Sequence, residues 1–281
     1  MELKPVRIRI ARDLAMKVLA TISSLIGIFF LGWILLEVAA RGLSALSLSF
    51  FTHLPAPPGM EGGGLANAII GTLLMTVLAT VAGVPVGIMG GVYLAEYGQT
   101  TLLGKSVRFT LNVIMGVPSI IIGLFVYTLI VLPVGHFTGY AGAFSLAVIM
   151  IPIIARVTED MLNMVPSSLR ESALAVGAPH WKMIVQIVFR AAKSGLMTGI
   201  LLAVARVSGE TAPLLFTALN SPYWPTSIGQ PTANLTVTIY NYAMSPYQDW
   251  QSIAWGASLL IMTSVLVMTV IARFVSRERV Q

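Results

Sequence analysis

Cysteine is absent from this chain of 281 residues, so disulfide bonds and thiol chemistry are excluded. Charge is scarce as well: charged residues make up 10% of the chain, whereas soluble domains carry about 25%. Hydrophobic residues account for 56%, and the mean hydropathy is +0.86. Because so little of this surface suits water, we predict an all-α integral membrane protein.

Histidine is rare, and the three residues, His53, His136 and His180, lie far apart in the sequence, which argues against a metal site built on them. The formal net charge of +6 alone would allow nucleic-acid binding. The charged residues stand at the ends of apolar runs, however, and form no basic patch, which argues against a nucleic-acid partner.

Long uncharged runs predict six membrane crossings, since a transmembrane helix needs about 20 apolar residues. The apolar segments cover about residues 18–36, 65–94, 109–155, 194–219 and 250–272. The run 109–155 is long enough for two helices with a turn at 132–139. A cleaved signal peptide is the alternative for the first segment, but its apolar run exceeds the roughly 7–15 residues of a signal core, so we predict a retained helix.

The positive charges predict the orientation. All of the 17 Lys and Arg residues except Arg41 and Arg206 fall in the two terminal segments, in the loop after the second helix and in residues 156–193. By the positive-inside rule, both termini and residues 156–193 are cytoplasmic. The last outer loop, about residues 220–249, is rich in Pro, Trp and Tyr, so part of it is expected at the membrane interface or dipping toward the membrane centre.

Small residues and prolines mark features within the predicted helices. Gly83, Gly87 and Gly91 recur every four residues, so they share one helix face and allow a neighbouring backbone to approach closely. Four prolines lie inside apolar runs, where they predict kinks: Pro85, Pro118, Pro152 and Pro213.

The fifth apolar segment, 194–219, contains two charged residues. On a continuous helix, Arg206 and Glu210 would share a face with small residues such as Gly199, and their spacing would let them partly neutralise each other. One interpretation is a structural ion pair that fixes helix packing. The other is a substrate path, because ionisable residues inside membranes often mark routes for ions or protons.

Motifs for an enzyme are missing. The stretch from Gly98 to Ser106 resembles a phosphate-binding P-loop, but five residues separate Gly98 from Gly104 where that motif has four. We therefore expect no ATP bound by this chain. No nucleophile–base arrangement is visible, so we predict a non-enzymatic protein without cofactors of its own.

The polar segment 156–193 contains a short helix signal. Ser168 and Glu171 have the spacing of a capping box, and Gly177 ends the pattern. The simple interpretation of Glu171 is a helix cap. A helix that presents small and apolar residues outside the membrane, however, needs a groove to fill, which indicates a protein partner.

The stretch Glu171-Ser-Ala-x3-Gly177-x9-Ile187-x-Phe-Arg190 resembles the EAA loop of type I ABC importer permeases, usually Glu-Ala-Ala-x3-Gly-x9-Ile-x-Leu-Pro. Ser172, Phe189 and Arg190 depart from that pattern. The resemblance implies the type I (MetI-like) permease fold with six transmembrane helices. It also implies that Glu171, Ala173, Gly177 and Ser168 form a coupling helix that fits the groove of a separate ATPase.

Two further stretches are similar to the PstA family of phosphate-importer permeases. One is residues 201–218, with Arg206-Val-Ser-Gly-Glu210-Thr-Ala-Pro, and the other is residues 230–246. This resemblance covers about residues 65–273. It implies a multi-pass permease of the bacterial inner membrane whose substrate path includes Arg206, Glu210 and Arg156.

The resemblance also implies partners. A periplasmic binding protein, PstS, would deliver inorganic phosphate, the homologous permease PstC would complete the path, and a PstB dimer would hydrolyse ATP with Mg²⁺. Membrane lipids surround the chain. The expected organisation is a tail, first helix and periplasmic loop over 1–64, a five-helix core over 65–273 with the coupling loop 156–193, and a C-terminal tail over 274–281.

Three alternatives stay open at this point. The chain could be an ABC permease for another oxyanion or small solute. It could be a secondary transporter or channel in which Arg206 and Glu210 serve gating or proton coupling, which predicts transport without ATP. A membrane-embedded enzyme ranks third because no catalytic arrangement is visible.

Overall fold

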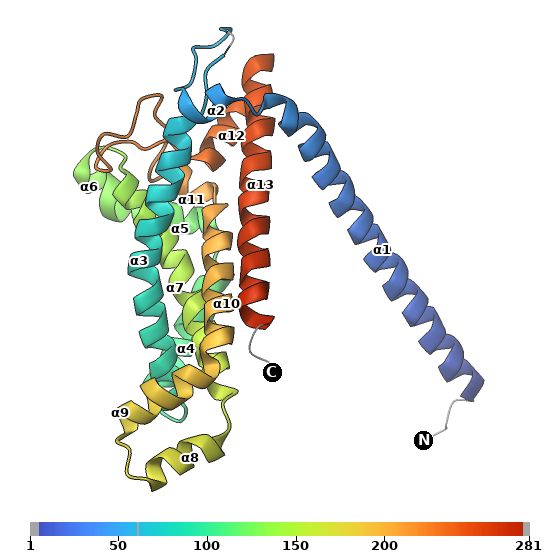
Figure 1. Cartoon of the computed structure of the whole chain (residues 1–281), viewed down its shortest axis with the longest axis vertical. Coiled ribbons are helices and arrows are strands. Elements are labelled where there is room, and N and C mark those ends of the chain that lie inside the picture. The colour runs from blue at the N-terminus through green and yellow to red at the C-terminus, as the bar shows by residue number, and fades with distance from the viewer. Residues whose placement is uncertain (1–5, 61, 278–281) are drawn as a thin grey trace.

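Helices account for the whole fold in the computed structural model, which describes residues 6–60 and 62–277 (Figure 1). The predicted tail 274–281 therefore lies partly outside the described residues. Five longer helices and several shorter ones follow one another along the chain. They are α1 (Val6–Ala45), α2 (Leu48–Thr52), α3 (Ala66–Glu96), α4 (Leu102–Gly116), α5 (Ser119–Val126), α6 (Leu132–Val134), α7 (Gly139–Asn163), α8 (Ser167–Ala175), α9 (His180–Lys182), α10 (Phe189–Ser208), α11 (Ala212–Leu215), α12 (Leu235–Ala243) and α13 (Gln248–Arg277).

The bundle has two distinct ends. Helix α8 lies at one end, and α2 and α12 lie at the other (Figure 1); we call these the α8 end and the α12 end. The start of α1 and the end of α13 both point toward the α8 end. This is the arrangement that the positive charges predict for the two termini and residues 156–193.

Helices α3 and α7 form the centre of the bundle. A Cβ atom added at Gly87 would lie 2.7 Å from the Cβ of Ile154, and one added at Gly91 would lie 2.4 Å from the Cβ of Thr158. Only glycine therefore allows this approach, and the packing interpretation of the glycine stripe is confirmed. Met150, which faces Gly83, is fully buried in the same interface.

The third predicted crossing is broken. Helix α4 ends at Gly116, α5 begins at Ser119 after Pro118, and the two are bent by 103°. Pro118 lacks a backbone donor and disfavours helical backbone in the residue before it, which explains the break. The turn predicted at 132–139 is confirmed in its second half: helical structure continues through a π-helical segment at Tyr127–Val131 into α6, which ends at Val134. Gly135 follows with a φ of +83°, and α7 begins at Gly139.

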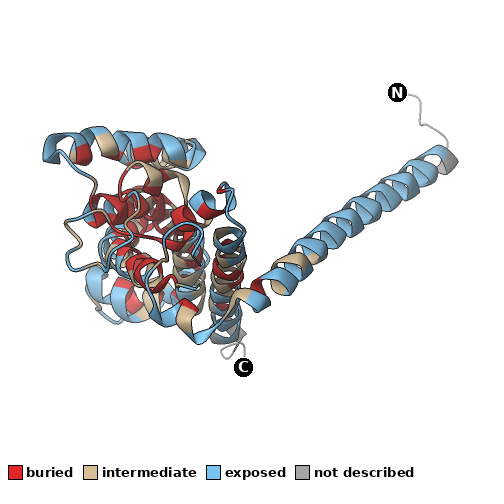
Figure 2. Ribbon diagram, turned by 90° about the horizontal axis from the view of Figure 1, so that it is seen from above, coloured by how far each residue is buried: buried red, intermediate tan, exposed pale blue. Residues whose placement is uncertain are grey.

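Counting crossings gives five continuous helices within the described residues, or six if α4 and α5 together form one crossing. The bend corrects the expectation that each crossing is a single helix. Helix α1 is the most unusual of the five, because it is exposed along most of its length and diverges from the bundle (Figures 1 and 2).

The long segment 220–249 is well packed. Residues 232–238 are all buried, and α12 begins there with Asn234 as its N-cap, whose side chain accepts a hydrogen bond from the Val237 amide (2.9 Å). Further along, Tyr242 stacks on Trp250 with ring centroids 4.3 Å apart. Burial raises the pKa of the Tyr242 hydroxyl. This segment closes the α12 end of the bundle.

The polar segment at the α8 end is shorter than the sequence suggests. Helix α7 continues to Asn163, and helical structure resumes at His180, runs through a π-helical segment at Met183–Val188 and continues into α10. Residues 164–179, with α8 inside them, are therefore the part that stands outside the long helices. The wider boundaries 156–193 came from counting charges, which also occur on the ends of helices.

Candidate functional site

Arg206 lies in the last turn of α10 and faces a cavity of about 250 Å³. Glu210, just beyond the helix, lines the same cavity. The remaining walls come from the α4–α5 bend and from α7, and they are mostly apolar: Ile114, Met115, Val117, Pro118, Ser119, Ile122, Ile149 and Ile153. The cavity therefore combines one cation and one anion with a largely hydrophobic wall.

The predicted pairing of Arg206 with Glu210 is wrong. Helix α10 ends at Ser208, where the amides of Gly209 and Glu210 bond to carbonyls three residues back, at Arg206 (3.3 Å) and Val207 (3.2 Å). Pro213 cannot donate the bond that would continue the helix. Because the chain turns there, the i, i+4 geometry is lost. Among the described residues no ion pair joins the two side chains, so the structural ion-pair interpretation is not supported.

The Arg206 guanidinium is available to bind an anion. It is exposed to the cavity side, and in the described part of the chain no hydrogen bond or ion pair engages its side chain. A guanidinium carries a permanent charge and a fixed fork of donors that matches oxyanions. Arg206 and Glu210 therefore act on the same space because they line one cavity, and not because they share a helix face.

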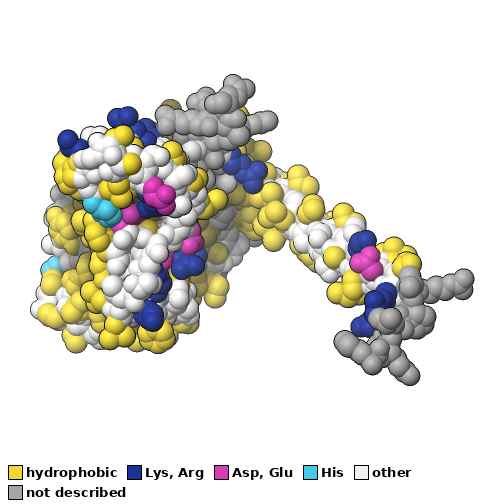
Figure 3. Space-filling view, turned by 90° about the horizontal axis from the view of Figure 1, so that it is seen from below, with side chains coloured by type: hydrophobic (Ala, Val, Ile, Leu, Met, Phe, Trp, Pro, Cys, Tyr) yellow, Lys and Arg dark blue, Asp and Glu magenta, His cyan; other side chains and the backbone are white. Residues whose placement is uncertain are grey.

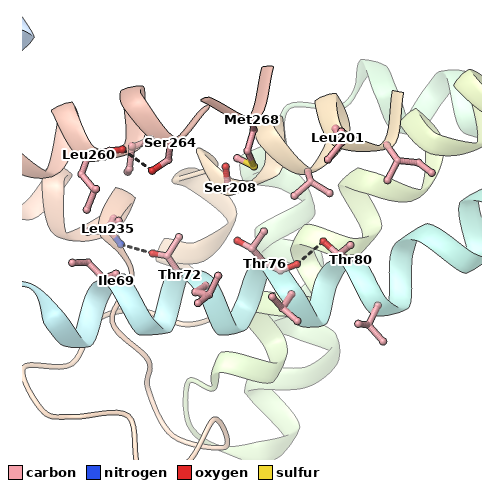
Figure 4. A pocket seen from close by; sticks show the side chains of 16 residues that line it. Ile69, Thr72, Thr76, Thr80, Leu201, Ser208, Leu235, Leu260, Ser264 and Met268 are labelled. Atoms are coloured by element: carbon pink, nitrogen blue, oxygen red, sulfur yellow. Dashed lines mark hydrogen bonds between the residues drawn. The ribbon is translucent and has the colours of Figure 1, made fainter. Parts of the chain in front are cut away.

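A larger cavity of about 570 Å³ lies between α3, α10, α12 and α13 (Figure 4). Its wall is apolar apart from hydroxyl groups, most of which are already bonded: Thr72 accepts from the Leu235 amide (2.8 Å), and Thr80 donates to the Thr76 carbonyl (2.7 Å). No charged residue lines it. This cavity suits a hydrocarbon chain and is unsuitable for an anion.

Arg156, the third predicted path residue, does not line the Arg206 cavity. It lies on α7 and forms ion pairs with Glu159 (3.5 Å) and Asp160 (3.3 Å). By helical spacing it is one turn closer to the α8 end than Ile153, on the same stripe of α7. The structure thus places Arg156 beside the cavity along the helix axis, with its charge already partly balanced.

Helix α8 contains the predicted coupling residues. Gly177 ends it as predicted: its φ is +82°, its amide bonds to the Leu174 carbonyl (3.0 Å), and the Ala178 amide bonds to the Ala173 carbonyl (3.1 Å). This is the Schellman arrangement. Ala173 points inward and is only 4% exposed, whereas Glu171 is exposed.

The capping box predicted for Ser168 is wrong. Helix α8 begins two residues earlier than a cap at Ser168 would give, at Ser167, and its N-cap is Pro166, so Ser168 lies within the first turn. Proline fixes a φ compatible with the residue before a helix and can start one without a side-chain cap. Glu171 is thereby released from a capping role and is free for a partner.

Two partly buried ion pairs at the α8 end were missed by sequence reasoning. Arg108 pairs with Glu159 (2.6 Å) and also donates to the carbonyls of Gly98 (3.0 Å) and Leu94 (2.8 Å). Arg170 pairs with Glu96. In the sequence these residues serve only as limits of apolar runs. One feature of the sequence points to these pairs: charges are rare in this chain, and several lie near the ends of apolar runs. Backbone carbonyls at helix ends have no partner within the helix and need a donor from elsewhere.

The stretch that resembles a P-loop has a packing role. A Cβ atom at Gly104 would lie within van der Waals overlap of the Gly98 backbone, so the two glycines allow the loop to close against the start of α4. Thr101 caps α4 by accepting from the Gly104 amide (3.0 Å). These contacts explain the glycines without a nucleotide.

Comparison with known families gives one match over most of the chain. Residues 83–280 match the family described as "Binding-protein-dependent transport system inner membrane component". A relative from Yersinia pestis, "Phosphate transport system permease protein PstA", is 49% identical over 93% of this chain and 89% of its own length. A "Probable phosphate transport system permease protein PstA" from Methanocaldococcus jannaschii is 32% identical over 98% and 97%.

Solved structures share the fold. A bacterial alginate ABC transporter in complex with an alginate-bound periplasmic protein superposes with a TM-score of 0.67 at 17% identity, covering 96% of each chain. The MetNI methionine ABC transporter in an inward-facing conformation gives a TM-score of 0.63 at 22% identity, over 76% of this chain and 96% of that chain. At these identities the likeness concerns the fold alone.

Proposed function

This chain belongs to the family of binding-protein-dependent transport system inner membrane components, and from that premise we propose that it is the permease subunit of an ATP-driven importer for inorganic phosphate. The observation that carries the substrate is the similarity, at 49% identity over nearly the whole chain, to a permease named for phosphate transport. The unpaired Arg206 guanidinium in its cavity supports the same substrate, because phosphate carries between one and two negative charges at neutral pH.

The proposal gives each part of the molecule a role. The α8 end faces the cytoplasm of a bacterial cell, as the positive charges predict, and the chain crosses the inner membrane several times. A periplasmic binding protein delivers phosphate at the α12 end. A homologous permease completes the path, since the Arg206 cavity is open on the surface of a single chain. This chain binds no nucleotide in the proposal, and a dimeric ATPase hydrolyses ATP.

Within the path, Arg206 attracts the anion and Glu210 limits how long it stays. A guanidinium alone in an apolar cavity would hold phosphate too tightly for rapid release. The Glu210 carboxylate repels the bound anion across the same cavity. Arg156, one turn closer to the cytoplasm, offers a further positive charge on the way out, already shared with Glu159 and Asp160.

At the cytoplasmic end, α8 is the part that meets the ATPase. Ala173 anchors the helix, Gly177 ends it, Ser168 lies in its first turn, and Glu171 projects outward. A short helix with an exposed acid and exposed apolar residues, including Val176 at 84%, is suited to a groove on another protein.

The test is phosphate-stimulated ATP hydrolysis. The chain is assembled in liposomes with the partner permease and ATPase encoded beside it, and the binding protein is added with or without phosphate. We expect the loaded binding protein to stimulate hydrolysis, and Arg206→Gln to reduce stimulated transport by at least about tenfold while assembly persists. Lys17→Gln, which breaks an exposed pair with Asp13 on α1, serves as the control.

Two other outcomes would indicate a different function for the chain. If hydrolysis responds only to a binding protein loaded with a different anion, the chain is a permease for another oxyanion. If the chain transports phosphate alone and associates with no ATPase, it is a secondary transporter.

A further inference from the structure

Helix α8 touches the rest of the chain at few points. Its inner side buries Ala173 in an apolar cluster with residues of the α7 end and the π-helical segment, among them Leu162, Met183 and Val188. Its other sides expose Leu174 and Val176. A helix of nine residues with one small buried side chain gains little from apolar burial, so the contacts that hold it in place are mainly polar.

Arg170 supplies the strongest of these contacts. Its guanidinium forms an ion pair with Glu96 through Nη1 and donates through Nη2 to the Leu162 carbonyl (2.6 Å). Glu96 is the last residue of α3, and Leu162 lies in the last turn of α7. The side chains of Arg170 and Glu96 are 19% and 4% exposed. One guanidinium thus joins α8 to the ends of both central helices.

Stability alone does not account for this pair. Replacing a buried ion pair by apolar residues is often neutral or stabilising, because removing two charges from water is costly. What a guanidinium bonded to two different acceptors provides is a defined direction, since its donors form a rigid fork. An apolar contact between α8 and α3 could slide, whereas this link fixes the orientation of α8 relative to α3 and α7.

Space beside the pair leaves α8 room to move. A cavity of about 470 Å³ separates part of α8 from the ends of α3 and α7, and Glu96 and Arg170 both line it, with Tyr97, Gln99 and Asn163. Figure 3 shows basic and acidic side chains together on this face of the molecule. The helix is therefore held at Arg170 and at Ala173, with this hollow beside them.

We propose that Glu96 and Arg170 are positioning residues that transmit displacement of α8 to α3 and α7 during ATP-driven transport. The inference rests on the proposed function, in which the ATPase moves α8. Helices α3 and α7 are locked together by the contacts of Gly87 and Gly91, so they move as one unit. Ile149 and Ile153 of that unit line the Arg206 cavity, and a shift of α7 therefore reshapes it.

The experiment compares coupling in reconstituted complexes. Glu96→Gln, Arg170→Gln and the charge-swapped double variant Glu96→Arg with Arg170→Glu are assembled with partner permease and ATPase. Basal hydrolysis, stimulation by loaded binding protein and phosphate imported per ATP are measured. We expect each single variant to keep basal hydrolysis but to lose phosphate imported per ATP by about tenfold. The swapped variant restores the attraction between the two positions but not the bond to the Leu162 carbonyl, so it should recover part of the loss.

A conservative variant at position 170 separates the effect of the directional hydrogen bonds from the effect of the positive charge. Arg170→Lys keeps the attraction to Glu96 but cannot also donate to the Leu162 carbonyl, so we expect partial uncoupling with normal assembly. If Arg170→Lys and both single Gln variants import phosphate with unchanged stoichiometry, the proposal is overturned. If the single variants fail to assemble and the swapped variant restores assembly but not coupling, the pair is merely structural and the proposal is also overturned.

The parent complex distinguishes this failure from a failure of the proposed function. If the unmodified complex shows no phosphate-dependent hydrolysis, the proposed function is wrong, whatever the variants do. If it shows such hydrolysis and the Glu96 and Arg170 variants remain fully coupled, only the role of the pair is wrong. Lys17→Gln, which removes an exposed ion pair with Asp13 on α1, is the matched control and should stay coupled.

Discussion

At the scale of single residues, the few charged side chains that lie within apolar segments are the candidates for binding an anion. Among the described residues no ion pair engages Arg206 or Glu210, and both side chains line one cavity. Keeping a cation unpaired near the membrane interior is costly, by at least about 2.5–3.5 kcal/mol on insertion scales. Such a cost is tolerated where a substrate or partner needs the charge.

The separation of the two side chains leads to a prediction about Glu210→Gln. Removing the carboxylate removes its repulsion of bound phosphate, so phosphate should remain longer at Arg206. We expect the half-saturating concentration to fall and the maximal import rate to fall by about tenfold, equivalent to about 1.4 kcal/mol. Initial rates of phosphate import into liposomes measure both quantities.

The control for this variant lines the same cavity. Ser119→Ala removes a neutral hydroxyl near the α4–α5 bend and should change import by much less than Glu210→Gln. An unchanged import curve for Glu210→Gln, in a complex that assembles normally, would show that the carboxylate does not act on the substrate.

At the scale of helices, the end of α8 depends on a single backbone conformation. Gly177 has a φ of +82°, which L side chains rarely adopt, and no atom lies within 4 Å of an added Cβ. Gly177→Ala therefore adds backbone strain of about 1–2 kcal/mol without a steric clash. We expect the amides of residues 177 and 178 to exchange with solvent roughly tenfold faster, as measured by hydrogen exchange.

Asparagine provides the matched comparison at the same position. Because Asn adopts the left-handed conformation more readily than Ala, Gly177→Asn should exchange at rates closer to the parent chain. Equal protection in Gly177→Ala and the parent would mean that the Schellman turn does not hold the end of α8.

Sequence reasoning identified the helices and, through Pro118, the bend between α4 and α5, but not where α10 ends. Apolar runs reveal burial in lipid, so the crossings and the glycine stripe at Gly83, Gly87 and Gly91 could be predicted from composition and spacing alone. The end of α10 at Ser208 could not, because the run 194–219 stays apolar beyond it and only Gly209 and Pro213 mark the turn. Ser168 failed as a cap because a proline at 166 began the helix earlier.

The pairs that join distant elements were beyond sequence reasoning for a different reason. Glu96 and Arg170 are separated by 74 positions, and Arg108 and Glu159 by 51. Nothing in a single sequence says which rare acid meets which rare base. The shared cavity of Arg206 and Glu210 likewise depends on the bend after α4, a tertiary feature that places Ile122 and Ser119 opposite α10.

At the scale of the whole molecule, α1 stands apart from the bundle. Its middle, residues 18–36, is apolar on all sides, which is typical of a helix surrounded by lipid or by other membrane helices. Its contact with the bundle is concentrated near its end, where α1 crosses α13. The organisation predicted from sequence places a boundary at residue 64, but Phe50 is 1% exposed and packs with Leu65 and Ala257, so α2 belongs physically to the core.

This geometry predicts that Gly42 is the joint between α1 and the bundle. A Cβ at Gly42 would lie 2.6 Å from the Cβ of Leu259 and 2.8 Å from the Trp255 carbonyl oxygen. Gly42→Leu should therefore force α1 away from α13, at a cost of about 1–3 kcal/mol. Gly32→Leu is the control, because nothing lies within 4 Å of an added Cβ there.

Because the chain has no cysteine, a disulfide can report on this joint directly. A Cβ at Gly256 would lie 3.1 Å from the Cβ of Ala45, close to the roughly 3.5–4.5 Å that a disulfide needs. Ala45→Cys with Gly256→Cys should cross-link under mild oxidation, and Gly42→Leu should reduce the yield while Gly32→Leu should not. Equal yields in both backgrounds would show that α1 is not anchored at Gly42. If Gly32→Leu cross-links normally but prevents assembly with the partner permease, the free length of α1 contacts that partner and not only lipid.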